Sequence, residues 1–324
     1  MGNLAVTGIT GKRGMYFLRQ VLKQEKDVLD KWDQIHYSVR SEEKSQLIKR
    51  LTENTDLLFI PFVGDTSDLG FVKKMCLCCD TLLHIAGIHT SRVVAEGAIE
   101  ANVKRMILVH TTGIYSKYKS TGEEYRKTDE IVYKLCREHD IALTILRPTM
   151  IYGNLHDGNV SVFIRMVDRL PLMPIVNGAR YELQPVHCRD LGIGYYQCLM
   201  SEKTAGHDYN LSGGEPIELR KMFDIIAGYL GVERRYVSCP YPIAYVGAWM
   251  LYIVTMGRMD YREKVQRLVE PRVFSYEDAN RDFGYAPVNF EIGVMNEVER
   301  YKRQNPKRGE YCRRQCGGHG EGES

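Results

Sequence analysis

The sequence predicts an α/β fold, a doubly wound parallel sheet followed by a smaller, mostly C-terminal lobe. Three observations lead to it. Through the first half of the chain, short apolar runs alternate with polar stretches of helical periodicity, which is the pattern of successive βαβ units. A glycine-rich turn directly follows the first apolar run. After Arg147 and Pro148 the chain becomes richer in Pro, Gly and Asn, which indicates a second lobe.

The expected strands are the apolar runs of the first half, at residues 4–7, 34–39, 57–63, 81–85, 106–110 and 142–146. Helices are expected between them at 15–24, 43–51 and 123–138. A strand at 208–211 and a helix at 219–230 follow. The first domain is expected to cover 1–155 with 184–202 returning to it, and the second lobe 156–183 and 203–304. Residues 305–324 have almost nothing to bury and are expected to be disordered.

Composition excludes one class of function. Hydrophobic residues make up 44% of 324 residues, which is enough for a sizeable core. Lys and Arg number 44 against 41 Asp and Glu, so the formal charge is only +3. Non-specific nucleic-acid binding relies on a concentrated positive field, which such a balance does not supply. Nucleic acid is therefore not expected as a partner.

The nine cysteines show no paired zinc-site spacing, including Cys312 and Cys316, and no secretory signal precedes them. We therefore expect no metal, reduced thiols and a cytoplasmic setting.

Residues 241–257 contain no charged side chain, but a membrane-spanning helix needs about 20 apolar residues, so this segment is short. A helix packed against another domain is the preferred interpretation. Peripheral membrane contact through 241–257 is the disfavoured one.

The first candidate site is the turn after the first strand. Residues 4–17 read LAVTGITGKRGMYF, and Gly8, Gly11 and Gly14 lie between the apolar strand and an amphipathic helix. Glycines at such a turn let the backbone approach a pyrophosphate, which then lies against the positive end of the helix. A glycine triplet also occurs at ordinary tight turns, but its position at the opening of the first βαβ unit favours dinucleotide binding.

The end of the second strand sets the choice of cofactor. An acidic residue there would bind the 2′-hydroxyl of NAD, and a cation would pair with the 2′-phosphate of NADP. This strand ends in Arg40, and Lys12 and Arg13 add two cations in the glycine turn. Such cations also occur on ordinary solvated surfaces. NADP is the favoured cofactor, and NAD is the alternative.

Together the motifs resemble the extended or atypical short-chain dehydrogenase/reductases, which include NAD(P)-dependent epimerases and dehydratases of nucleotide sugars. TGITGKRG resembles the family's cofactor turn, HIAG its fourth-strand turn, HTTGIY the end of its fifth strand and LRPTMIYG that of its sixth. QPVHCRDLG, YNLSGGEPIELRKM and FSYEDANRDFGYAP follow in the family's order. The resemblance implies a Rossmann domain that binds NAD(P) and a substrate-binding lobe made mostly from the C-terminal half.

The resemblance also implies site residues. Those expected to bind cofactor are Gly8, Thr10, Gly11, Lys12, Arg13, Gly14, Arg40, Gly64, Asp65, Ala86, Gly87, Pro148 and Thr149. Those expected to bind substrate are Thr112, Met150, Gln184 and Arg272. Met150 departs from the Asn that many nucleotide-sugar members carry. Thr111 takes the catalytic role of the family's Ser or Thr, with Thr112 as the neighbour that could replace it.

The catalytic tyrosine is assigned to Tyr125. The literal Tyr-x-x-x-Lys motif is Tyr115 to Lys119, but Tyr115 already fits the loop after the fifth strand. Tyr125 begins the next helix and lies 22 residues before Arg147, about the family's interval. In this register Asp129 takes the position of the family's lysine. A free tyrosine has a pKa of about 10, and a nearby carboxylate raises it instead of lowering it.

The leading functional hypothesis is an NAD(P)-dependent epimerase/dehydratase or reductase that transfers hydride to or from a nucleotide-sugar-like or other small hydroxyl or carbonyl substrate. Because Asp129 replaces the lysine, the alternative is a catalytically impaired NADP-binding sensor or assembly protein on the same fold. A homodimer is compatible with the resemblance.

Overall fold

The computed structural model describes residues 2–118, 120 and 122–306. Its chain divides into two compact units. The first unit contains the residues up to Thr149, together with Cys188–Ser212 and Phe274–Pro287. The second contains Met150–His187, Gly213–Val273 and the described residues from Val288.

A parallel seven-stranded sheet forms the centre of the first unit, in the order β11-β6-β5-β4-β1-β2-β3. Its strands are β1 (Gly2–Thr7), β2 (Trp32–Val39), β3 (Leu58–Val63), β4 (Cys79–His84), β5 (Arg105–Val109), β6 (Ala142–Pro148) and β11 (Asp208–Leu211). The inner strands are buried on both faces, which is why they read as apolar runs. β3 lies at an edge, where Pro61, which cannot donate a backbone hydrogen bond, is tolerated. The predicted strands of the first half are confirmed.

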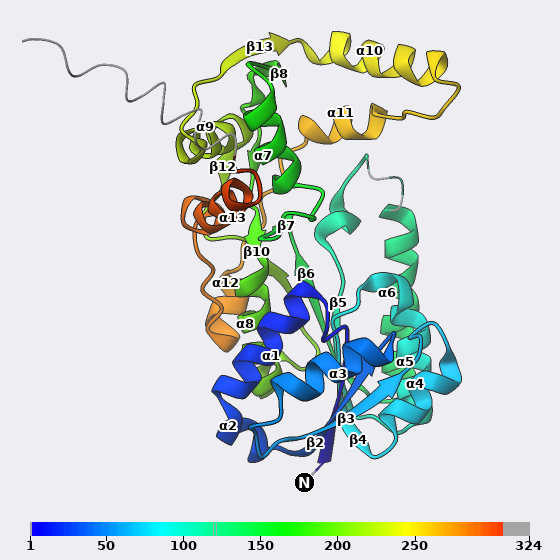
Figure 1. Ribbon diagram of the computed structural model, residues 1–324. Helices are drawn as coiled ribbons and strands as arrows, with labels where there is room; N and C mark the ends of the chain where they lie inside the picture. The colour runs from blue at the N-terminus through cyan, green and yellow to red at the C-terminus, as the bar shows by residue number, and fades with distance from the viewer. Residues whose placement is uncertain (1, 119, 121, 307–324) are drawn as a thin grey trace, which may run out of the picture. The chain divides into compact units, whose positions relative to one another are not determined.

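Helices cover both faces of this sheet. They are α1 (Lys12–Lys23), α2 (Glu25–Leu29), α3 (Glu42–Leu51), α4 (Leu69–Cys76), α5 (Ser91–Glu100), α6 (Gly122–Glu138), α8 (Cys188–Met200) and α12 (Glu277–Phe283), with the short turns η1 (Ile88–Thr90), η2 (Thr112–Tyr115) and η4 (Glu202–Thr204). α1 packs against α8 on one face, whereas α5 packs between α4 and α6 on the other (Figure 1). The doubly wound α/β fold is therefore confirmed.

The edge strand β11 accounts for most of the difference between the predicted and observed boundaries. The sequence predicts the strand at 208–211 in the second lobe, but Asp208 pairs with Ile145 and Leu211 with Pro148 in the main sheet. The segment that returns to the first unit is consequently Cys188–Ser212, where 184–202 was predicted. Phe274–Pro287 also belongs to the first unit, and the first boundary follows Thr149, where residue 155 was predicted.

The second unit is a small α/β body. Its elements are β7 (Ile151–Tyr152), α7 (Val160–Arg169), β8 (Leu172–Val176), η3 (Asn177–Ala179), β9 (Glu182–Leu183), β10 (Val186–His187), β12 (Ile217–Glu218), α9 (Leu219–Leu230), β13 (Arg235–Cys239), α10 (Tyr241–Val254), α11 (Arg262–Leu268) and α13 (Phe290–Gln304). α9 packs against α7 and α13, and Ile164, Ile226 and Val294 are part of their shared core. The predicted helix at 219–230 is confirmed. Most of the predicted tail, residues 307–324, lies outside the described residues.

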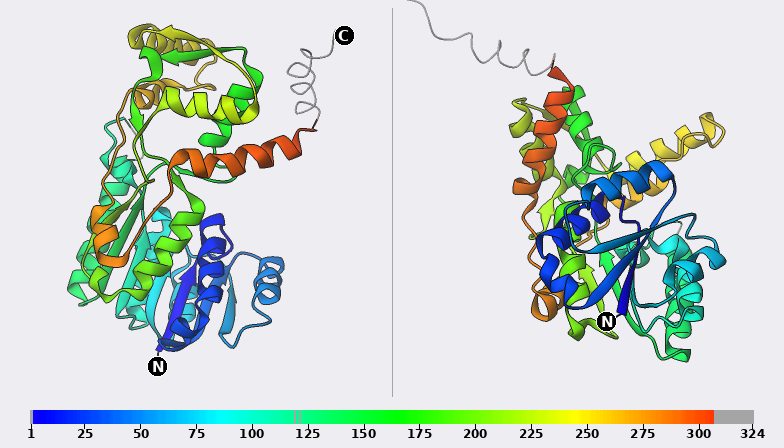
Figure 2. Two further views of the ribbon diagram at one scale, coloured as in Figure 1. Left: turned by 90° about the vertical axis from the view of Figure 1, so that its left-hand side faces the viewer. Right: turned by 60° about the horizontal axis from the view of Figure 1, so that its bottom comes forward.

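The uncharged segment forms the helix α10, and most of its large apolar side chains are exposed. Ala248 is its one buried residue, and Ile243 and Val254 are exposed. α10 packs along α11 (Figure 1, Figure 2). Of the helices in the described part of the chain, none has the length and apolar character needed to cross a membrane.

Candidate functional site

The glycine turn begins where β1 ends, and two of its glycines have no room for a side chain. Gly8 has a φ of +75°, and a Cβ there would lie 2.7 Å from the backbone nitrogen of Ala86. A Cβ on Gly14 would overlap the carbonyl oxygen of Gly8. The turn therefore brings the backbones of β1, α1 and the loop after β4 together, and only glycine permits this approach.

The N-terminus of α1 forms the next part of the site. The N–H of Gly11, its N-cap residue, donates to Gly8 O at 3.0 Å, and Gly11 O accepts from Met15 N–H at 2.8 Å. The first turn contains Lys12 and Arg13 and no acidic residue. The first N–H groups of a helix have no intrahelical partner, and they carry the positive end of the helix dipole. This end of α1 is therefore suited to an anion.

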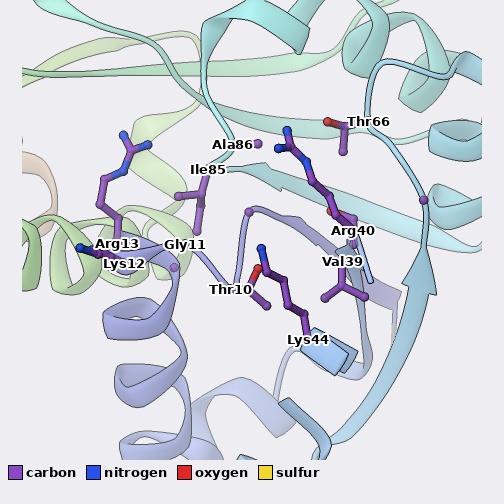
Figure 3. Close-up of a pocket in the computed structure, with 14 residues that line it drawn as sticks. Thr10, Gly11, Lys12, Arg13, Val39, Arg40, Lys44, Thr66, Ile85 and Ala86 are labelled. Carbon is purple, nitrogen blue, oxygen red and sulfur yellow. The ribbon is translucent and has the colours of Figure 1, made fainter. Parts of the chain in front are cut away.

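A cavity of about 240 Å³ lies at this turn (Figure 3). It is lined by Gly8, Thr10, Gly11, Lys12, Arg13, Gly14, Ser38, Val39, Arg40, Lys44, Gly64, Thr66, Ile85 and Ala86. The lining comes from the carboxyl ends of neighbouring parallel strands, where doubly wound sheets bind ligands. Pockets for whole ligands measure roughly 300–1,000 Å³, so this cavity is sized for part of a dinucleotide.

Four cationic side chains line the cavity, and the described residues that line it include no acid. Lys12 and Arg13 belong to α1, whereas Arg40 and Lys44 lie on the other side of the turn, after β2 and in the first turn of α3 (Figure 3). Ser41 caps α3, with its Oγ accepting from Lys44 N–H at 3.4 Å. Lys44 was missed in the sequence. Ser41 could have indicated it, because a serine that caps a helix beginning at residue 42 places Lys44 in the first helical turn, close to Arg40.

Asp65 follows the cavity residue Gly64 but does not line the cavity itself. Its Oδ1 accepts from Ser67 N–H at 2.9 Å. This bond, together with the positive charge of Arg40, holds the pKa of the Asp65 carboxyl below its ordinary value. The Asp65 carboxylate, in the loop after β3, therefore lies near enough to Arg40 to interact with its charge.

The turn after β4 is fixed by a buried histidine. His84 Nε2 donates to Gly87 O at 2.9 Å, and Nδ1 accepts from the Thr7 hydroxyl at 2.6 Å. The proton is assigned to Nε2 because a carbonyl oxygen can only accept. Burial lowers the pKa of His84 to about 4, with smaller effects from His110 and Arg13. His84 is therefore neutral near pH 7 and ties β1 to the loop that carries Ala86.

The two threonines after β5 make different contacts. Thr111 Oγ1 accepts from Gly113 N–H at 3.0 Å, which leaves its hydroxyl proton for another acceptor. Thr112 is buried and donates to Pro148 O at 3.2 Å. Thr149 N–H donates to Leu211 O at 3.2 Å, so the backbone after β6 is tied to β11. Thr112 thus has a structural bond, which leaves Thr111 as the better placed hydroxyl of the pair.

Tyr125 lies in the first turn of α6 and is buried. Its hydroxyl lies 3.5 Å from His89 Nε2, and the two rings meet edge to face with centroids 5.4 Å apart. Tyr115 is exposed and its ring lies 5.5 Å from that of Phe274, while Lys119 lies outside the described residues. The sequence did not single out His89, although it follows HIAG by two positions.

Asp129, at the position of the family's lysine, is buried in an ionic network. Its carboxylate accepts from His110 Nδ1 at 2.6 Å and from the Arg147 guanidinium at 2.6 Å. The other side of the guanidinium pairs with Asp208 at 2.5 Å. Burial opposes ionisation, but the bonds from His110 and Arg147 outweigh it and hold the pKa of Asp129 below its ordinary value. Asp129 therefore links α6 to β5 and β6, and Arg147 extends the link to β11.

Three predicted substrate-binding residues belong to the second unit. Gln184 is buried, and its amide donates to Gly213 O at 2.8 Å. Met150 packs against the core of this unit. Burial, followed by repulsion from Arg267, lowers the pKa of Arg272 to about 10. A half-buried cation of this kind favours an anionic ligand, so Arg272 stays a candidate for substrate binding.

The cavity brings together nine of the predicted cofactor-binding residues: Gly8, Thr10, Gly11, Lys12, Arg13, Gly14, Arg40, Gly64 and Ala86. Asp65, Gly87, Pro148 and Thr149 are not among its lining residues. Ser38, Val39, Lys44, Thr66 and Ile85 line it without having been predicted. Val39 and Ile85 could have been predicted from their positions at the ends of β2 and β4. The carboxyl ends of parallel strands meet at the same edge of the sheet, where the cavity lies.

Among the residues that the structure describes, no cysteine lines the cavity, and the buried thiols of Cys76 and Cys79 are poor nucleophiles because they stay protonated. Burial raises the pKa of the Cys79 thiol to about 12 and that of Cys76 further still. Over residues 2–118, 120 and 122–306, no cluster of three or more His, Cys, Asp or Glu is arranged to hold a metal ion. Cys312 and Cys316 lie outside this range.

No model of a known protein family matches the chain. The chain is similar to NADH dehydrogenase (ubiquinone) 1 alpha subcomplex subunit 9, mitochondrial, of Dictyostelium discoideum, with 26% identity over 139 residues that cover 43% of this chain and 37% of that protein. The protein of the same name from Arabidopsis thaliana is 22% identical over 252 residues, 74% of this chain and 60% of that protein. The chain thus spans less than two thirds of either relative.

An enzyme is also among the relatives. The 2-alkyl-3-oxoalkanoate reductase of Stenotrophomonas maltophilia is 25% identical over 167 residues, which cover 48% of this chain and 50% of the reductase.

Solved structures match the chain almost from end to end. The dTDP-glucose 4,6-dehydratase of Streptomyces venezuelae, solved with NAD bound, has a TM-score of 0.68 and 19% identity over 94% of this chain and 98% of that one. The NADPH-dependent quinone oxidoreductase of Escherichia coli has a TM-score of 0.68 and 14% identity over 91% of this chain and 99% of that one. At these identities the likeness shows the fold. The resemblance predicted from the sequence is thus confirmed in the architecture: this chain has the fold of the extended short-chain dehydrogenase/reductases.

Proposed function

We propose that the first unit binds NADP(H) and that the protein is an NADP-dependent oxidoreductase or epimerase/dehydratase. Its substrate would be a hydroxyl or carbonyl compound such as a nucleotide-linked sugar. The observation that carries the proposal is the cavity at the glycine turn, which has four cations and no acid among its described lining residues.

The two pairs of cations suit the pyrophosphate and the 2′-phosphate of NADP. Lys12 and Arg13 stand at the N-terminus of α1, where a pyrophosphate would also meet the helix dipole. Arg40 and Lys44 stand after β2, where the 2′-phosphate of the adenosine ribose would lie. NAD would leave Arg40 and Lys44 without an anionic partner in the cavity. This arrangement supports NADP over NAD.

The proposed chemistry uses Thr111 and Tyr125. The nicotinamide of a bound NADP(H) would supply or accept the hydride. Thr111 would donate a hydrogen bond to the substrate oxygen and keep its proton, and Tyr125 would exchange the proton of that oxygen as general acid or base. His89 Nε2, 3.5 Å from the Tyr125 hydroxyl, would relay the proton. Because the imidazole is exposed, it can exchange that proton with water. His89 would thus take over part of the role of the missing lysine.

The test combines cofactor titration with turnover on a panel of sugar nucleotides and ketones. Tyr125→Phe is expected to abolish turnover and to leave NADPH affinity unchanged. His89→Ala is expected to lower kcat and to displace the pH profile. Turnover that survives in Tyr125→Phe would remove this residue from the mechanism.

A second function is favoured by one observation, the network around Asp129. A buried carboxylate, bonded to His110 and Arg147, takes the position of the lysine that would lower the pKa of Tyr125. The chain would then be an NADPH-binding sensor or assembly protein without turnover. The similarity to the two NADH dehydrogenase subunits supports this alternative.

Affinity capture of partners with and without NADPH separates the two functions. The enzyme predicts turnover and a partner set that ignores the cofactor. The sensor predicts no turnover on any substrate and at least one partner whose binding depends on NADPH.

A further inference from the structure

The helix α10 presents large apolar side chains along its length. The sequence holds no Asp, Glu, Lys, Arg or His between Arg235 and Arg258. Ile243 is 62% exposed, Met250 57% and Val254 76%. Contiguous exposed apolar surface of this kind marks an interaction site. The NADP(H) site of the first unit does not account for it.

The exposed side chains cover more than half of the helix circumference. With 3.6 residues per turn they span an arc of about 200°, formed by Ile243, Val246, Trp249, Met250, Leu251, Ile253 and Val254. The opposite side holds the buried Ala248 and also Tyr252, whose ring centre lies 3.9 Å from the guanidinium carbon of Arg262 on α11. α11 therefore covers that side (Figure 1, Figure 2), and the side chains of the wide arc are exposed.

The width of the arc favours lipid over a protein groove. A helix that packs against protein needs an apolar stripe on the order of 100° wide and carries polar residues on the rest of its surface. Acyl chains instead surround whatever part of a helix enters them. Trp249, which is 49% exposed, lies within the arc, and tryptophan is a residue that prefers the boundary between water and hydrocarbon.

The charge next to α10 fits an anionic surface. Residues 258–268 carry the cations Arg258, Arg262, Lys264 and Arg267 against the acids Asp260 and Glu263. Two of the cations pair with these acids, Arg262 with Asp260 at 2.7 Å and Arg267 with Glu263 at 3.9 Å. Arg258 and Lys264 are both exposed, and the Lys264 ammonium lies 4.9 Å from the centre of the Tyr261 ring, so both cations can reach phosphate headgroups.

We propose that α10 and α11 form a membrane-docking hairpin that lies on an anionic lipid bilayer. The apolar arc of α10 enters the boundary between headgroups and acyl chains, and Arg258 and Lys264 contact lipid phosphates. The hairpin lies in the interface and does not cross the bilayer, because the 14 residues of α10 are fewer than the roughly 20 that a spanning helix needs.

Co-sedimentation of the full chain with lipid vesicles tests the proposal. Vesicles that contain phosphatidylglycerol are expected to bind the protein more tightly than vesicles of phosphatidylcholine alone, because they add the attraction of Arg258 and Lys264. The double variant Met250→Glu/Val254→Glu is expected to lose at least about tenfold in affinity, since it places two charges on the arc that enters the acyl boundary. Arg258→Glu is expected to remove the preference for the anionic vesicles.

Tryptophan fluorescence gives a second readout. The chain has two tryptophans, and Trp32 is 3% exposed in the first unit. In a Trp32→Phe background, Trp249 emission is expected to shift to the blue on anionic vesicles and to be quenched by lipids brominated in their acyl chains. Ile292→Glu, at a position on α13 that is 57% exposed, is the matched control and should change neither readout.

Three outcomes would overturn the proposal. They are failure to sediment with either vesicle, a Trp249 emission that ignores lipid, and equal loss of binding in Ile292→Glu and in the double variant. A concentration-dependent dimer that the double variant disperses, without vesicle binding, would assign the arc to a second copy of the chain. Thermal unfolding of each variant separates loss of binding from loss of fold.

Discussion

Replacing Arg40 with alanine is expected to weaken NADPH binding and to leave NADH binding nearly unchanged. Arg40 lines the cavity after β2, and Lys44 lines it from the first turn of α3. The only chemical difference between the two nucleotides is the 2′-phosphate. A cation that binds this group therefore contributes to the affinity of one nucleotide alone.

The expected magnitude follows from the kind of contact. A hydrogen bond to a charged group contributes about 2 kcal/mol, so Arg40→Ala should raise the Kd of NADPH roughly 30-fold. Lys44 offers a point charge without the planar fork of arginine, and Lys44→Ala should have a smaller effect, roughly 3- to 10-fold. Both effects should shrink with added salt, because the side chains are exposed and the screening length at physiological ionic strength is about 8 Å.

Fluorescence titration with NADPH and NADH measures both affinities directly. Arg50→Ala is the matched control, since Arg50 is exposed on the same helix as Lys44 and its Nε donates to Gln46 O at 3.3 Å. Arg40→Asp should reverse the preference, because a carboxylate repels the 2′-phosphate and accepts a bond from the 2′-hydroxyl of NAD.

Two results would refute the reasoning. If Arg40→Ala weakens NADPH and NADH by the same factor, Arg40 contacts a part that both nucleotides share. If it changes neither while NADPH still binds, the 2′-phosphate lies elsewhere and the assignment of the cation pairs is wrong.

Three further substitutions test the fold around the sites. Gly8→Ala should abolish NADPH binding and lower the melting temperature, because φ is +75° and the new Cβ would meet Ala86 N at 2.7 Å; Gly228→Ala in α9, with nothing within 4 Å, should do neither. Asp129→Ala should lower the free energy of unfolding by about 1–3 kcal/mol, since His110 and Arg147 each lose a buried bond while Asp208 still pairs with Arg147; an effect no larger than that of the exposed Glu130→Ala would refute the network. Burial, followed by the charge of Asp157, raises the pKa of Glu297 from its ordinary 4.5 to about 8. The folded state then binds more protons than the unfolded state between these values, so stability should fall as pH rises through this window. Glu297→Gln should flatten that slope in denaturant titrations, and an unchanged slope would exclude Glu297 as its source.

The glycine turn shows how much of the site a local sequence pattern can predict. LAVTGITGKRG alone indicates a strand, a tight turn and a helix start, because backbone conformation and helix dipoles are properties of neighbouring residues. It therefore identified all six lining residues that come from the turn after β1 and from the start of α1. Lys44 and Thr66 escaped because they reach the cavity from elements whose ends meet it only when the sheet is assembled.

Asp129 shows the opposite case. In the sequence it is a missing lysine, a departure that counts against catalysis. In the structure it is the partner of His110 and Arg147, which come from the ends of β5 and β6. Sequence spacing could place Asp129 on one face of a helix, but it could not predict which residues pack against that face.

The sequence by itself determined the alternation of strands and helices, the turn that precedes α1 and the cationic end of β2, because each depends on residues close together in the chain. Only the tertiary structure decided that β11 joins the sheet, that Asp129 is neutralised by Arg147 and that the apolar arc of α10 stays exposed. These three depend on which distant segments come into contact. A strand needs a neighbour for its backbone hydrogen bonds, a buried charge needs a counter-ion, and an apolar helix stays exposed where nothing packs over it.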